Sequence, residues 1–198
     1  MAKVLNIISD EHRSIGAILH GMQHLVNEIR QHHRKIDCGV FRAMLYYLDT
    51  FSERMHHPKE DRYLFSAMRR HGAAAGALID ELEREHAAGA QNLRRLEQAL
   101  LRYEEGGGAE FDAFARVADQ FSADYRAHMR KEEDQVYPLA RKLLSADQWD
   151  DIGDDIDRAF AGNRDPLAAE RDGADFAKLF SRIVALAPPP IGVGPAAA

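Results

Sequence analysis

Apolar residues recur every three or four positions through most of the first 144 residues, which is the period of an amphipathic helix. Gly72 and the run Gly106–Gly108 interrupt this pattern, and Asp37 is placed to cap the start of a helix. The sequence therefore predicts four long helices, at about residues 4–33, 37–71, 73–105 and 109–144. Short connections between long helices favour an antiparallel up-down-up-down four-helix bundle, so the predicted fold class is all-α.

The composition changes after Leu144. A capping box that begins at Ser145 predicts a short acidic helix, and a second short helix is predicted at about residues 176–186, before an extended tail. We therefore divide the chain into a bundle of residues 1–144 and a C-terminal helical appendage and tail of residues 145–198.

The composition of this 198-residue chain also narrows its function. The net charge of -6 disfavours a protein that binds nucleic acid through its phosphates. The single cysteine, Cys38, excludes an internal disulfide and a cysteine-rich zinc cluster. No apolar run approaches the roughly 20 residues of a membrane-spanning helix, and the N-terminus lacks the apolar region of a signal peptide. We therefore expect a cytoplasmic protein that binds neither nucleic acid nor membranes.

Each of the four predicted helices carries one histidine on its apolar face, and these are His12, His56, His86 and His128. Glu60 and Glu132 each follow one of these histidines by four residues, so each pair lies on one face of its helix. Imidazole and carboxylate ligands suit iron, manganese and zinc alike, and two metals about 3.5–4 Å apart need a bridging ligand. These six residues are the candidate metal ligands.

Two simpler interpretations compete with a metal site. One histidine on an apolar face is usually a hydrogen-bonded core residue, and one His-x-x-x-Glu pair is usually a surface ion pair. Burying four histidines and two glutamates together would be costly without a cation to neutralise the carboxylates. The six residues taken together therefore favour the metal site.

Three neighbouring residues carry further expectations. His57 points about 100° away from the preceding histidine, so we expect it on the surface. Pro58 lies between two candidate ligands and should kink its helix. Tyr125, three residues before His128, either packs in the core or points toward the metal or donates to a ligand carboxylate.

The order of these residues resembles the hemerythrin-like, or HHE cation-binding, domain family in its bacterial form. The strings that carry the resemblance are Asp10-Glu11-His12-Arg13, His56-His57-Pro58-Lys59-Glu60-Asp61, Glu85-His86 and His128-Met129-Arg130-Lys131-Glu132-Glu133. The resemblance covers about residues 4–144. It implies a four-helix bundle that holds two non-haem iron ions bridged by Glu60 and Glu132, while the residues alone leave manganese and zinc open.

The chain differs from the oxygen-carrying members of that family at two positions. Those proteins have a further histidine four residues before the one matched by His86, where this chain has Leu82. They also have an aspartate five residues after the fourth-helix histidine, where this chain has Glu133. Fewer protein ligands leave an open coordination position, which disfavours reversible oxygen carriage. We therefore expect a diiron protein that captures or senses oxygen, peroxide or nitric oxide.

Two alternative functions stay open. The same site could serve an enzyme that acts on peroxide, or an iron donor in iron–sulfur repair, although repair proteins of this superfamily usually carry an added cysteine-bearing domain. The chain could instead be a metal-free helical protein that acts through its surfaces on a protein partner that the sequence does not identify.

Overall fold

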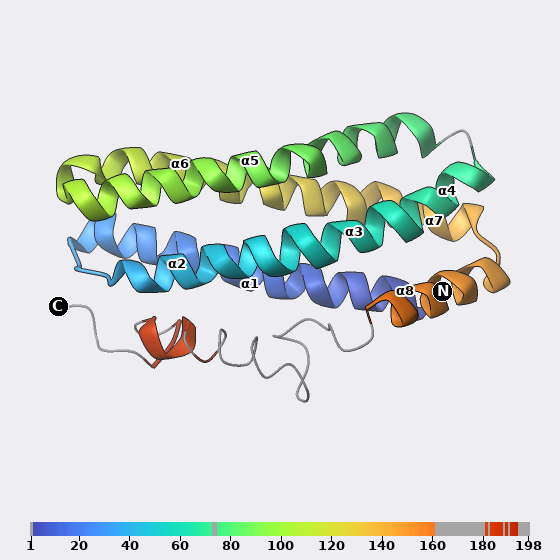
Figure 1. The fold of residues 1–198 in the computed structure, drawn as a ribbon, viewed down its shortest axis with the longest axis horizontal. Coiled ribbons are helices and arrows are strands. Elements are labelled where there is room, and N and C mark those ends of the chain that lie inside the picture. Colours follow the sequence, from blue (N-terminus) through green and yellow to red (C-terminus); the bar gives the residue numbers. More distant parts are fainter. Residues whose placement is uncertain are drawn as a thin grey trace.

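The computed structural model describes residues 2–72, 75–160, 181, 183–187, 189 and 191–193, and it confirms the predicted all-α bundle. Four long helical stretches lie side by side and alternate in direction (Figure 1). The first is α1 (Ala2–His32), and the third is α5 (Gly76–Gly106). The second stretch consists of α2 (Cys38–Tyr47), η1 (Leu48–His56), α3 (His57–Lys59), η2 (Glu60–Phe65) and α4 (Ser66–His71). The fourth stretch consists of α6 (Gly108–Lys131), η4 (Glu132–Val136) and α7 (Tyr137–Leu143).

The segments η1, η2 and η4 are π-helical, so their backbone hydrogen bonds reach one residue further back than those of an α-helix. The N–H of His57, for example, donates to the carbonyl of Ser52. Pro58 and Pro138 each stand near the start of the α segment that follows a π segment. The chain stays helical through Pro58 and changes between α and π geometry on both sides of the proline, while the kink expected there stays a prediction. Such π turns are often found at functional sites.

The helix ends follow local rules that the sequence predicts. The side chain of Asp37 accepts a hydrogen bond of 2.8 Å from the N–H of Gly39, which confirms the cap of α2. Gly107 joins α5 to α6 with a φ of 64°, a left-handed conformation that favours glycine. A further helix, α8 (Ala146–Ala159), begins with the predicted capping box between Ser145 and Gln148.

Two apolar clusters fill the bundle on either side of a polar layer. The larger cluster holds residues such as Ile15, Leu19, Phe51 and Phe114, together with many others from all four stretches. The second cluster lies toward the other end and includes Leu64, Phe65, Leu82, Val136 and Trp149. The six candidate ligands belong to neither cluster, and they are buried where each helical stretch passes from one cluster to the other. The apolar packing on both sides therefore fixes the height at which the four helices present these polar residues.

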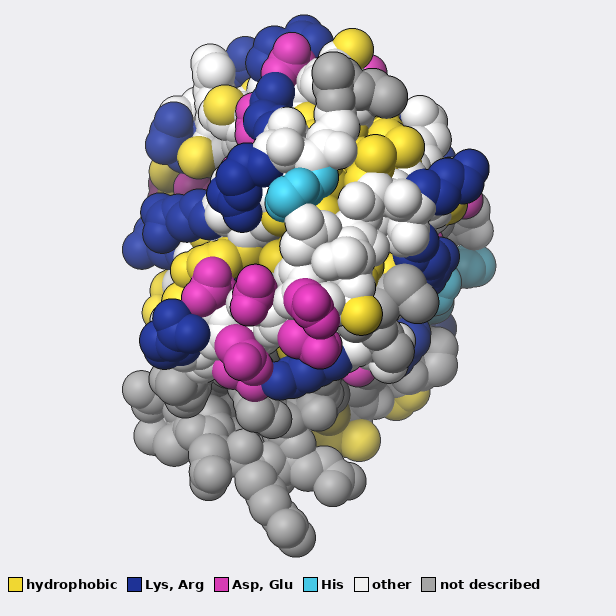
Figure 2. Space-filling view, turned by 90° about the vertical axis from the view of Figure 1, so that its right-hand side faces the viewer, with side chains coloured by type: hydrophobic (Ala, Val, Ile, Leu, Met, Phe, Trp, Pro, Cys, Tyr) yellow, Lys and Arg dark blue, Asp and Glu magenta, His cyan; other side chains and the backbone are white. Residues whose placement is uncertain are grey.

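The helix α8 packs across α1 and η2 at one end of the bundle, where it contributes Trp149, Ile152 and Ile156 to the second cluster. Figure 2 views the molecule from this side, and acidic side chains gather in a group on the face that carries α8. Of the predicted last helix, residues 183–186 are helical, whereas Phe176, Leu179 and Phe180 lie outside the described residues. Among the helices that the structure describes, none is long and apolar enough to cross a membrane.

Candidate metal centre

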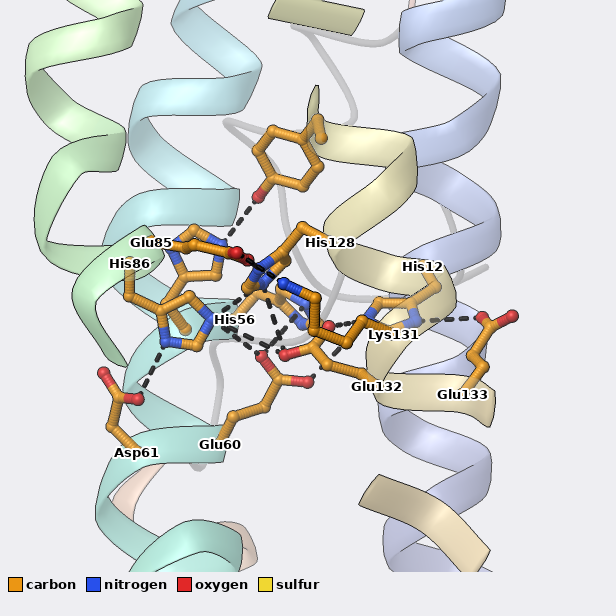
Figure 3. A network of polar contacts seen from close by, with 12 residues as sticks. His12, His56, Glu60, Asp61, Glu85, His86, His128, Lys131, Glu132 and Glu133 are labelled. Carbon is orange, nitrogen blue, oxygen red and sulfur yellow. Dashed lines mark hydrogen bonds and ion pairs between the residues drawn. The ribbon is translucent and has the colours of Figure 1, made fainter. Parts of the chain in front are cut away.

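The six candidate ligands come from all four helical stretches and meet between the two apolar clusters (Figure 3). None of the six is more than 8% exposed, and His56, Glu60 and Glu132 are completely buried. Their ligand atoms form two groups close enough to hold a metal ion, and these groups are His12, His56 and Glu60 on one side and Glu60, His86, His128 and Glu132 on the other. The structure therefore brings together all six residues that the spacing in the sequence singles out, and their role as metal ligands stays a prediction.

Glu132 stands between the two groups. Its Oε2 atom lies 3.3 Å from Nε2 of His12, while its Oε1 atom lies 3.3 Å from Nε2 of His128. Glu60 is placed in the same way, with Oε1 at 3.6 Å from Nε2 of His12 and Oε2 at 3.6 Å from Nε2 of His86. Each carboxylate thus faces histidines of both groups, which is the arrangement that a pair of bridged cations requires.

Six buried atoms at this centre have no hydrogen-bond partner among the described residues. They are Nε2 of His12, Nε2 of His56 and both carboxylate oxygens of Glu60 and of Glu132. Leaving a buried polar group without a partner costs roughly 1–3 kcal/mol, and more if the group is charged. Metal–ligand bonds of about 2.0–2.2 Å place two ligands of one cation about 3–3.5 Å apart, close to the separations observed here. The donor set therefore fits one or more metal cations.

The other nitrogen of each histidine is held by a carboxylate from a neighbouring helical stretch. The Nδ1–H of each ring donates a hydrogen bond, and the pairs are His12 with Glu133 at 2.9 Å, His56 with Glu11 at 2.9 Å, His86 with Asp61 at 2.8 Å and His128 with Glu85 at 2.7 Å. These four contacts close a ring around the bundle, because each stretch supplies one histidine and one such carboxylate. A carboxylate on Nδ1 fixes the tautomer and aims the Nε2 lone pair at the metal.

Sequence reasoning did not single out these four carboxylates as partners of the histidines. A signal was present nonetheless, since each carboxylate is adjacent in the sequence to a candidate ligand: Glu11 precedes His12, Asp61 follows Glu60, Glu85 precedes His86 and Glu133 follows Glu132. The adjacent residue on a helix points about 100° away, which here means toward the next helix of the bundle.

The pKa values of the histidines depend on two opposing influences, which are burial and the negative charge of the nearby carboxylates. Burial lowers the pKa of His86, but the hydrogen bond to Asp61 and the contacts with Glu132 and Glu60 outweigh it and raise that pKa to about 10. Burial also lowers the pKa of His12, but the contacts with Glu132, Glu133 and Glu60 outweigh it and hold that pKa well above its ordinary value. Burial dominates at His56 and lowers its pKa well below the ordinary value. A cation at this centre therefore competes with protons on some of its ligands.

The prediction that His57 lies on the surface is wrong. His57 is 5% exposed, and its ring stacks on that of His86 with the centroids 4.0 Å apart. The rotation of about 100° from His56 turns the side chain of His57 from α1 toward α5 and α6. These helices cover a second side of the second helical stretch, so His57 is buried as well. His57, His86 and His128 form a third group whose ligand atoms are close enough to hold a metal ion.

Tyr125 lies beside His57 and does not reach the ligand carboxylates. Its hydroxyl is hydrogen-bonded to Nε2 of His57 at 2.8 Å and to the side chain of Ser52. Burial raises the pKa of Tyr125 well above its ordinary value, and nearby Glu53 adds to the shift. The phenol is therefore neutral, and it contacts the site through an imidazole instead of through a carboxylate.

A buried ion pair closes the side of the centre near His56. Lys59, only 2% exposed, donates to Glu11, and its Nζ also lies 5.5 Å and 5.0 Å from the ring centres of Phe51 and Phe160. Burial raises the pKa of Glu11, while Lys59 acts in the opposite direction and favours the carboxylate. Lys59 thus favours the charged form of Glu11, which accepts the hydrogen bond from His56.

A buried set of histidines and glutamates in a four-helix bundle defines the class of carboxylate- and histidine-rich metal proteins. Comparison with protein families makes the assignment specific, because the hemerythrin HHE cation-binding domain matches residues 3–140. The chain belongs to this family, as its sequence predicts. Comparisons with curated proteins and with solved structures found no significant match.

Proposed function

We propose that this protein holds two non-haem iron ions and uses them to capture or sense a small ligand such as oxygen, peroxide or nitric oxide. His12, His56, Glu60 and Glu132 would hold one ion, and His86, His128 and the same two glutamates would hold the other. The observation that carries this proposal is the set of six buried ligand atoms that have no hydrogen-bond partner in the described part of the chain. Both carboxylates among them face histidines on either side.

Two ions fit this donor set better than one. The carboxylate oxygens of Glu132 are divided between His12 on one side and His128 on the other. Four neutral imidazoles and two carboxylates supply a charge of about -2, which leaves a pair of cations with positive charge for an anionic or polarisable ligand. When bound, such ions supply redox chemistry and open coordination positions that the side chains lack.

The residues of the chain prepare this site in three ways. The carboxylates on Nδ1 orient the four rings before any cation arrives. The apolar clusters above and below exclude water. The buried Lys59 balances the charge of Glu11 without contacting the ligand atoms of Glu60 and Glu132.

Ligand binding tests the proposal. Iron-loaded protein is mixed without air with nitric oxide, with hydrogen peroxide or with oxygen, and its absorption spectrum is followed. We expect a saturable change with at least one of the three, and loss of that change in His128→Ala protein. A protein that holds iron but shows no change with any of them would contradict ligand capture.

An enzyme that acts on peroxide at the same centre is the second candidate function. It is favoured by a cleft of about 870 Å³ that reaches His86 and His128, because this space exceeds the needs of a diatomic ligand. Turnover separates the two functions: an enzyme consumes many equivalents of peroxide per chain, whereas a sensor responds to a stoichiometric amount.

A further inference from the structure

The two sides of the metal centre differ in their access to solvent. A cleft of about 870 Å³ runs along the seam between α5 and α6, and His86 and His128 line it, whereas His12 and His56 do not. On the His56 side, the Lys59–Glu11 pair and the rings of Phe51 and Phe160 cover the site. A molecule from solvent therefore meets the His86–His128 side through the cleft.

A buried carboxylate in the lining of the cleft is a second, independent indication of a ligand. Glu53 lines the cleft, its side chain is only 9% exposed, and its Oε1 atom is buried without a hydrogen-bond partner among the described residues. Its Oε2 atom lies 3.5 Å from Nδ1 of His57. A buried carboxylate oxygen without a partner is an acceptor that requires an O–H or N–H donor.

Gly89 lets the carboxylate of Glu53 pack directly against α5. It lines the cleft three residues after His86, and a Cβ atom built there would lie 2.3 Å from Oε2 of Glu53. Any larger side chain at position 89 must push Glu53 aside or fill the cleft beside His57.

We propose, on the basis of the proposed function, that this cleft is the ligand pocket and that its ligand is a hydroperoxide. The O–H group of the hydroperoxide donates to the carboxylate of Glu53, and its O–O bond faces His86 and His128. Oxygen and nitric oxide have no O–H group to donate, so Glu53 selects hydroperoxides over both. The size of the cleft admits an organic hydroperoxide as well as hydrogen peroxide.

The test compares iron-loaded wild-type protein with Glu53→Gln, Gly89→Leu and Ala90→Leu proteins. Ala90 is the matched control, because it is exposed on α5 and does not line the cleft. The probes are hydrogen peroxide, tert-butyl hydroperoxide and nitric oxide, and the readouts are iron content, the spectrum before mixing and the rate of the spectral change. Iron content and the initial spectrum show that each variant is folded and loaded.

We expect Glu53→Gln to weaken or slow the response to both hydroperoxides about tenfold or more, because a neutral amide oxygen replaces the charged acceptor, and to leave the response to nitric oxide unchanged. Gly89→Leu should slow tert-butyl hydroperoxide more than nitric oxide, and Ala90→Leu should match the wild type. If both Glu53→Gln and Gly89→Leu respond to hydroperoxides like the wild type, the pocket is wrong.

A second readout needs no metal. Amide NMR spectra of metal-free protein titrated with tert-butyl hydroperoxide should show shifts at Gly89 and Tyr125 that Glu53→Gln abolishes. The absence of shifts there would overturn the pocket. Wild-type protein that holds no iron would overturn the proposed function, and the pocket with it. Iron-loaded wild type that responds to nitric oxide but to neither hydroperoxide would overturn the pocket alone.

Discussion

The Nδ1 atom of His56 lies 2.9 Å from Oε2 of Glu11, and this contact is one of four that hold the histidines of the centre. The carboxylate accepts the Nδ1–H, so the Nε2 lone pair of His56 points toward Glu60. The same arrangement recurs at each of the other three helical stretches. Each histidine is therefore oriented by a carboxylate of a neighbouring helical stretch, and all four stretches take part.

The first prediction concerns this orientation. Glu11→Gln should lower metal affinity about 10- to 100-fold, because an amide holds the imidazole less firmly and makes it a weaker base. Competition with a coloured chelator measures the affinity. Glu97→Gln, at an exposed position of α5, is the control and should bind metal like the wild type. Equal affinities for both variants would contradict a role for Glu11 in positioning His56.

The buried ion pair between Lys59 and Glu11 should contribute to the stability of the fold. Lys59→Met leaves the buried carboxylate of Glu11 without its cation, and we expect the free energy of unfolding to fall by about 3–5 kcal/mol. Urea unfolding of the metal-free protein measures the change. The double variant Lys59→Met/Glu11→Leu removes both charges, and it should recover part of the loss. A single variant as stable as the wild type would contradict this account.

Tyr125→Phe tests the contact between the phenol and the site. The iron-loaded variant should hold as much iron as the iron-loaded wild type, because Tyr125 hydrogen-bonds to His57 and Ser52 and not to Glu60 or Glu132. Its absorption spectrum should shift, since His57 stacks on His86 and loses a partner. We expect the free energy of unfolding to fall by about 1 kcal/mol. An iron spectrum identical to that of the wild type would show that Tyr125 serves only in packing.

Metal uptake should release protons at pH 7.5. In the metal-free protein His86 has a pKa of about 10, so a cation must displace its proton. Titration calorimetry with Mn²⁺ in buffers of different ionisation enthalpy counts the protons. Affinity should rise with pH up to about 10, and affinities that are equal at pH 7 and pH 9 would contradict the prediction.

The same raised pKa predicts how the metal-free chain depends on pH. Protonated His86 stabilises the metal-free fold fully below the ordinary histidine pKa of 6.5, and this stabilisation is lost as the pH rises toward about 10. The metal-free protein should therefore become easier to unfold by urea across this range, and His86→Leu protein should show less of this change.

The helices and the clustering of the six candidate ligands could be predicted from the sequence because both depend on local spacing. A four-residue interval places Glu60 under His56 whether or not the surrounding turn is π-helical, and the cap at Asp37 requires only its own backbone. The position of His57 could not be predicted in this way, because it depends on which neighbours cover the second helical stretch. The cleft and the unpartnered oxygen of Glu53 likewise arise from the packing of η1 against α5 and α6, which no interval in the sequence encodes.

The metal content of the purified protein tests the central claim most directly. Protein produced with iron available, washed free of loosely bound metal, is analysed by elemental analysis alongside a Glu60→Ala/Glu132→Ala variant. We predict two iron ions per wild-type chain and less than one in the variant, since both glutamates face both histidine groups. A wild-type chain that holds no metal, or a single zinc ion, would contradict the proposed diiron centre.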